Sequence, residues 1–207
     1  MQTATLTLLH PLAAEDRARA NFYGVMAALF ADEPSRGLLR AIGEAEPLPD
    51  APSGSLPAAW NRLVAACQVM DADAARQEYF DLFVGTGKSE INLHGSHWET
   101  GFMMEKPLVK LRDDLASLGL ARRAESTMLE DHLAALCETM RLLIEGDGER
   151  KPAPVEDQAK FFETHISGWV PDLCSALKQS LLANFYRPVG EFVDIFVAVE
   201  RDSFAIG

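Results

Sequence analysis

The stretch LEDHLAALCETMRLLI, residues 129–144, has an apolar side chain at every third or fourth position. In an α-helix this spacing gathers the apolar side chains on one face, which can then pack against a core. The apolar positions are Leu129, Leu133, Leu136, Cys137, Met140, Leu143 and Ile144. The stretch therefore predicts an amphipathic helix with one buried face.

Similar spacing recurs along most of the chain, so the sequence predicts an all-α fold. The chain has 207 residues, which is enough to build one substantial core. We therefore expect residues 1–207 to form a single-domain helical bundle. The other segments with helical spacing lie near residues 22–30, 60–70, 108–118, 173–181 and 193–199.

A few segments depart from the helical pattern. Residues 3–8 alternate in a strand-like way, but they are short and terminal. Proline and glycine residues predict surface connections at residues 47–57 and at about 146–154. The longest segment without helical spacing is a loop at about residues 85–105. Because long loops in compact domains are often functional, this loop is a candidate for part of a binding site.

Composition argues against several classes of protein. Hydrophobic residues make up 48% of the chain and charged residues 24%, as in an average soluble domain. No apolar run approaches the ~20 residues that span a bilayer, and charged residues interrupt the first twenty positions where a secretory signal would lie. We expect a cytoplasmic protein without stable membrane insertion. Its cysteines lie far apart within helical patterns, which predicts buried free thiols at Cys67, Cys137 and Cys174.

The net charge of −12 makes nucleic acid an unfavourable partner, because phosphate binding needs clustered lysine and arginine. An acidic protein attracts basic ligands, although the charge also serves solubility alone. Both interpretations stay open at this point.

Tyr79, Leu82 and Phe83 are spaced at i, i+3 and i+4, so they share one helix face. Spacing alone favours core positions for them. The functional alternative is that part of this stripe faces a groove that receives an extended or helical peptide.

Thr127-Met128-Leu129-Glu130 has the form of a capping box and predicts that a helix begins there. Asp131 and His132 would then lie near the first turn, where the helix dipole favours a carboxylate and disfavours a protonated histidine. The pair is either a polar contact to a ligand or a solvated aspartate beside a packed histidine.

Metal-binding and catalytic motifs are incomplete. No histidine completes a Glu-x-x-His pair of the type that holds di-iron sites in helical bundles. Nucleophile-elbow and Rossmann patterns are missing, and Leu82 stands where a phosphate-binding Gly-x-x-x-x-Gly-Lys-Ser motif would need its first glycine. We expect no catalytic residue, no metal and no cofactor. The less favoured alternative is a metal-dependent enzyme that uses His94, His97, Glu99 and His132.

Five motifs occur in an order that resembles the TorD/DmsD/NarJ family of redox-enzyme maturation chaperones. The resemblance runs from residue 78 to residue 169, and residues 92–97 depart from the prolines that family members usually carry before the second motif. The motifs are Tyr79-Phe80-Asp81-Leu82-Phe83, Trp98-Glu99-Thr100-Gly101-Phe102, Glu105-Lys106-Pro107-Leu108, Asp131-His132, and Phe161 with His165 and Trp169.

The resemblance implies an all-helical chaperone without catalytic activity. Such proteins bind the twin-arginine signal peptide or the apo form of a molybdenum-cofactor oxidoreductase, assist cofactor insertion and prevent premature export. A helical adaptor for an unrelated protein is the alternative, and the sequence is compatible with a monomer or a homodimer. The expected peptide-binding residues are Tyr79, Leu82, Phe83, Trp98, Glu99, Phe102, Asp131 and His132.

Overall fold

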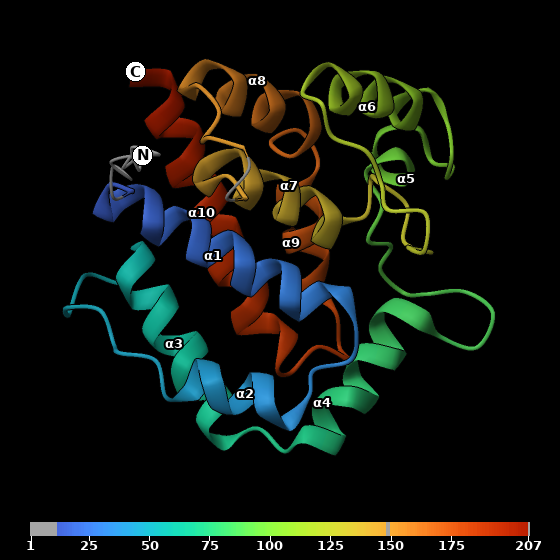
Figure 1. Ribbon diagram of the computed structural model, residues 1–207. Coiled ribbons are helices and arrows are strands. Elements are labelled where there is room, and N and C mark those ends of the chain that lie inside the picture. The colour runs from blue at the N-terminus through green and yellow to red at the C-terminus, as the bar shows by residue number, and fades with distance from the viewer. Residues whose placement is uncertain (1–11, 148–149, 207) are drawn as a thin grey trace, which may run out of the picture.

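The computed structural model describes residues 12–147 and 150–206 (Figure 1). Within these residues the chain forms ten α-helices and one π-helical turn, and no strand, which confirms the predicted all-α fold. The strand-like stretch at residues 3–8 lies outside the described residues. None of the described helices is both long and apolar enough to cross a membrane.

The elements are α1 (Ala14–Ala31), α2 (Arg36–Gly43), α3 (Leu56–Val69), α4 (Ala72–Tyr79), the π-turn η1 (Phe80–Val84), α5 (Gly95–Thr100), α6 (Lys106–Ser117), α7 (Leu133–Glu145), α8 (Val155–His165), α9 (Val170–Gln179) and α10 (Tyr186–Ile206). The longest connections lie between α2 and α3, between η1 and α5, and between α6 and α7.

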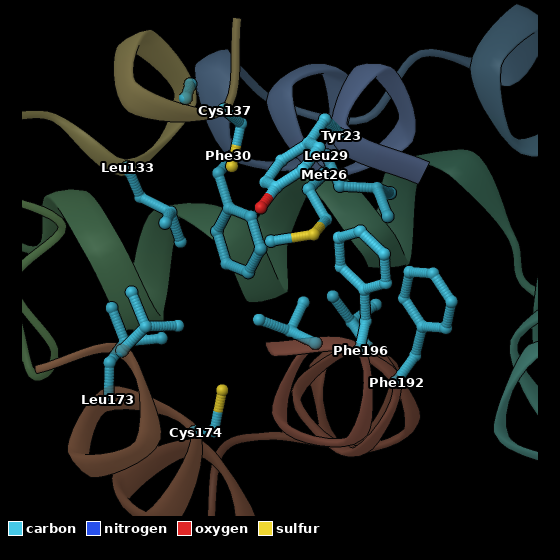
Figure 2. Packing of buried hydrophobic residues seen from close by; sticks show 14 of the residues in the cluster. Tyr23, Met26, Leu29, Phe30, Leu133, Cys137, Leu173, Cys174, Phe192 and Phe196 are labelled. Carbon is cyan, nitrogen blue, oxygen red and sulfur yellow. The ribbon is translucent and has the colours of Figure 1, made fainter. Parts of the chain in front are cut away.

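The core lies between α1, α7, α9 and α10. Helix α1 packs along α7, and α10 packs against α9 on one side and α3 on the other. Figure 2 shows aromatic and aliphatic side chains of α1 meeting those of α9 and α10. Cys137 and Cys174 are fully buried within this core. The apolar face predicted for residues 129–144 is buried from Leu133 onward, whereas Leu129 lies before α7 and is half-buried.

The predicted capping box at residues 127–130 is wrong. Helix α7 begins at Leu133, and His132 is its N-cap residue. The backbone of residues 131 and 133 instead bonds to residues 95 and 93, which keeps the chain extended just before the helix. Glu130 turns away and accepts two hydrogen bonds from the Arg112 guanidinium, at 3.1 and 3.0 Å.

The predicted loop at residues 85–105 contains the short helix α5, which the apolar spacing did not reveal. Tertiary contacts stabilise it, because Gly95 lies against the buried ring of Trp169. A Cβ atom at position 95 would be 3.0 Å from the Trp169 Nε1 atom, so only glycine allows this approach without a shift. Figure 1 shows α5 and α6 together, at the opposite side of the molecule from α3.

Candidate functional site

The loop before α5 and the start of α7 are joined by a short antiparallel bridge between His94 and His132. The Gly95 N–H donates to the Asp131 carbonyl at 2.9 Å, and the Leu133 N–H donates to the Leu93 carbonyl at 2.8 Å. This bridge brings the Trp98-Glu99 motif and the Asp131-His132 motif to one place, although they are distant in the sequence.

Asp131 is almost completely buried, with 3% of its surface exposed. Its Oδ2 atom accepts hydrogen bonds from the Ser96 backbone N–H at 3.1 Å and from the Ser96 hydroxyl at 2.5 Å. Its Oδ1 atom is buried and has no hydrogen-bond partner among the described residues. An unsatisfied buried acceptor costs about 1–3 kcal/mol, so a donor that reached Oδ1 would recover free energy.

The two histidines of the bridge are neutral near pH 7. The Ala134 N–H donates to His132 Nδ1 at 3.2 Å, which places the ring proton on Nε2. The pKa of His132 is lowered to about 4, chiefly by burial and also by the neighbouring His94, while Asp131 opposes the shift. Burial also lowers the pKa of His94. The two rings meet edge to face with their centroids 5.0 Å apart.

The α5 segment presents a mixed surface beside this bridge. Trp98 is half-buried, and its indole N–H donates to the Asn92 carbonyl at 2.8 Å. Glu99 is exposed, and Phe102, just after α5, has 69% of its surface exposed. This segment therefore exposes both an apolar ring and a carboxylate.

Tyr79 and Leu82 belong to the core, as their spacing favours, and they do not line an open groove in this structure. The Tyr79 hydroxyl donates to the Phe30 carbonyl at the end of α1, at 3.1 Å. The Ile91 N–H donates to the Leu82 carbonyl at 2.9 Å, which anchors the start of the loop. Phe83 is half-buried, with its ring 4.8 Å from that of Tyr186. These residues therefore anchor the start of the loop to the core.

Sequence reasoning missed the residues that hold the Asp131 junction together. Ser96, Asn92 and Gly95 carry no pattern of their own. Ser96 and Gly95 contact residues distant in the chain, whereas the Asn92 side chain bonds to the nearby His94. The sequence pointed to Trp169 only through a motif that resembles one found in the chaperone family. Its indole N–H donates to the His165 carbonyl at 2.8 Å, which fixes the ring under Gly95.

A separate hollow of about 510 Å³ lies between α1, α3, α8 and α10. Phe22, Phe196 and Phe204 contribute apolar walls. The carboxylate of Glu200 in its lining is neutralised by Arg19, whose Nε atom lies 2.7 Å from it. The remaining acidic residues of the lining are Glu15, Asp16 and Glu156. The sequence did not predict this hollow, because its residues come from four separate helices.

The described part of the chain contains no group of three or more histidine, cysteine or acidic side chains that could hold a metal ion. The metal-dependent alternative therefore lacks a ligand set within these residues.

The sequence model of the nitrate reductase delta subunit family matches residues 50–175. The chain belongs to this family. A crystal structure described as a redox enzyme maturation protein from Archaeoglobus fulgidus has the same fold, with a TM-score of 0.56 and 14% sequence identity over 99% of each chain. A comparison with curated proteins gave no match. The family confirms the resemblance to the NarJ/TorD-like chaperones, and together with the fold it indicates a redox-enzyme maturation chaperone.

Proposed function

We propose that this chaperone acts in the cytoplasm on the precursor of a molybdenum-cofactor oxidoreductase. It binds the twin-arginine signal peptide or the apo form of that enzyme, assists cofactor insertion and prevents premature export. The observation that carries the proposal, besides family membership, is the buried Asp131 Oδ1 atom without a partner, at the junction of two family motifs.

The chemistry of this junction suits a twin-arginine signal, which is a positively charged segment followed by an apolar one. The Asp131 Oδ1 atom can accept a hydrogen bond from a peptide N–H or guanidinium, and the exposed Glu99 adds negative charge. Phe102 and the half-buried Trp98 offer apolar surface to the second segment. His132 contributes a neutral Nε2–H donor.

Because Asp131 is buried, a peptide reaches it only if α5 moves. Helix α5 has six residues. It is held by the His94–His132 bridge, the hydrogen bonds from Ser96 to Asp131, packing against α6 and the contact between Gly95 and Trp169. The loop would move relative to the packed side chains of Tyr79, Leu82 and Phe83, which stay in place.

Titration calorimetry of the full chain against a twin-arginine signal peptide tests the proposal. The matched ligand is the same peptide with both arginines changed to alanine. We expect saturable binding that weakens at least tenfold, about 1.4 kcal/mol, for the alanine peptide. Asp131→Asn keeps an acceptor for Ser96 but removes the charge, and it should weaken binding by a similar factor.

Asp202→Asn is the matched control, because it removes one exposed carboxylate from α10, away from this junction. It should bind the peptide as the unmodified chain does. Equal losses for both variants would attribute the effect to net charge and not to the junction.

Val199→Asp tests whether the peptide binds instead in the hollow between α1, α3, α8 and α10, because Val199 lines that hollow. Normal binding by Asp131→Asn and Phe102→Ala, with loss of binding by Val199→Asp, would assign the peptide to that hollow. The adaptor alternative would stand if several signal peptides and the apoenzyme all failed to bind.

A further inference from the structure

Phe102, Met103 and Met104 form an exposed apolar tip between α5 and α6. Their exposed fractions are 69%, 40% and 67%. Three successive large apolar side chains in water are unfavourable for an isolated chain, and such surface usually has a binding role.

The backbone holds this tip in place. The Thr100 hydroxyl donates to the Ser96 carbonyl at 2.8 Å, and its oxygen accepts from the Phe102 N–H at 3.2 Å. The Gly101 N–H donates to the His97 carbonyl at 2.8 Å. Met104 has a φ of 60°, a left-handed conformation that costs a residue with a side chain about 1–2 kcal/mol. These hydrogen bonds fix the chain up to Phe102, directly before the two exposed methionines.

The other described methionines are less exposed to solvent than Met103 and Met104. Met26 and Met140 are fully buried, and Met70 and Met128 are half-buried against the core. Oxidation of a thioether requires that the oxidant reach the sulfur atom. Met103 and Met104 are therefore the two most exposed methionines in the part of the chain that the structure describes.

We propose that Met103 and Met104 are a reversible oxidation site for hydrogen peroxide. The thioether sulfur attacks one peroxide oxygen, a sulfur–oxygen bond forms and the oxygen–oxygen bond breaks. The sulfur loses two electrons, and the peroxide is reduced to one molecule of water for each sulfoxide formed. Methionine sulfoxide reductases reverse the change.

Oxidation converts a flexible apolar side chain into a polar one. The modified tip adjoins Phe102, so it would no longer bind an apolar peptide segment well. This consequence rests on the proposed function. We expect the doubly oxidised protein to bind the signal peptide about tenfold more weakly than the reduced protein.

Peptide mapping by mass spectrometry after treatment of the folded full-length chain with limiting hydrogen peroxide tests the site itself. Met103 and Met104 should be oxidised at least ten times faster than Met26 and Met140. A mixture of the two methionine sulfoxide reductases, one for each sulfoxide epimer, should restore the original mass. Equal rates for all four methionines would overturn the proposal.

Calorimetry with and without peroxide treatment tests the consequence. A Met103→Leu/Met104→Leu variant should lose no affinity on treatment relative to its own untreated state, whereas the matched variant Met70→Leu/Met128→Leu should lose affinity on treatment as the unmodified chain does. Unchanged affinity of the oxidised chain would overturn the regulatory role. Selective oxidation together with no peptide binding in either state would count against the proposed function but would support the modification site.

Discussion

The Glu78 carboxylate accepts hydrogen bonds from three successive backbone N–H groups where α10 begins. The donors are Asn184 and Tyr186, both at 2.8 Å, and Phe185 at 3.0 Å. A helix start leaves its first N–H groups without partners, and a carboxylate there also interacts favourably with the helix dipole. One side chain of α4 thus fixes the position of the longest helix of the core.

Glu78→Ala should therefore lower the free energy of unfolding by about 2–3 kcal/mol, because buried N–H groups lose a charged acceptor. Urea unfolding measures this. Gln77→Ala, at an exposed position of the same helix, should change the free energy by less than about 0.5 kcal/mol. A Glu78→Ala chain as stable as the unmodified one would show that water replaces the carboxylate at no cost.

The pKa of His132 predicts that the free energy of unfolding falls in acid. This pKa is about 4 in the folded chain and 6.5 ordinarily. Above pH 6.5 the ring is neutral in both folded and unfolded chains, so it has no effect on the pH dependence. Between pH 6.5 and 4 the unfolded chain takes up the proton first, and stability falls. At pH 5 this group alone should cost about 2 kcal/mol relative to pH 7.5.

His132→Asn isolates this contribution, because asparagine keeps an N-cap acceptor for the Ala134 N–H but does not titrate. Urea unfolding at pH 7.5 and pH 5 should show a smaller loss for the variant, by about 2 kcal/mol. The shift of His94 has the same sign and stays in both proteins. The same loss in both proteins would mean that the His132 ring is protonated equally in the folded and unfolded chains.

At the scale of elements, the position of α5 includes one close approach to the core, between Gly95 and Trp169. Gly95→Ala would place a Cβ atom 3.0 Å from Trp169 Nε1 and 3.2 Å from Cε2, and Trp169 is buried with its N–H bonded. The short helix must then move away from α9, at a cost of about 1–3 kcal/mol. Urea unfolding measures the loss, and tryptophan fluorescence reports the new environment of Trp169.

Gly37→Ala in α2 is the control, because its Cβ would meet only the Ser35 hydroxyl at 3.7 Å. This change should be neutral or stabilise the chain by up to about 1 kcal/mol. A Gly95→Ala chain without loss of stability would show that α5 does not rest on Trp169.

The helices that the sequence predicted well are those whose apolar faces pack against the core along their length. Residues 133–144 of α7 are an example, since Leu133, Leu136, Met140 and Leu143 all prove buried. Helix α5 has no such face, so periodicity could not reveal it. The capping-box prediction was wrong because backbone bonding to residues 93–95 overrides the local preference of residues 127–130.

For the site, the sequence singled out Asp131 and His132 but placed both in the first turn of a helix, whereas His132 is the N-cap residue of α7 and Asp131 precedes it. It could not show that Ser96 occupies one carboxylate oxygen and leaves the other without a partner, because that depends on a bridge between distant segments. The burial of Tyr79 and Leu82 followed from spacing, whereas their binding role stays a prediction.

At the scale of the whole molecule, the buried apolar residues form one continuous cluster that reaches from Ala20 in α1 to Val197 in α10. Trp60 on α3 packs against Phe22, with the ring centroids 5.3 Å apart. Trp98 and Trp169 lie at the other side, around α5. Tryptophan fluorescence can therefore follow the two sides of the fold separately.

A single cooperative domain predicts that both sides unfold together. In a Trp98→Phe/Trp169→Phe variant fluorescence reports only Trp60, and in a Trp60→Phe variant it reports only the α5 region. Within each variant, the urea midpoint from fluorescence should equal the midpoint from far-ultraviolet circular dichroism, which follows all helices. An earlier fluorescence midpoint in the Trp60→Phe variant alone would mean that the α5 region opens before the core. That opening would be the movement that exposes Asp131 to a peptide, so the same experiment measures the free energy that binding must supply.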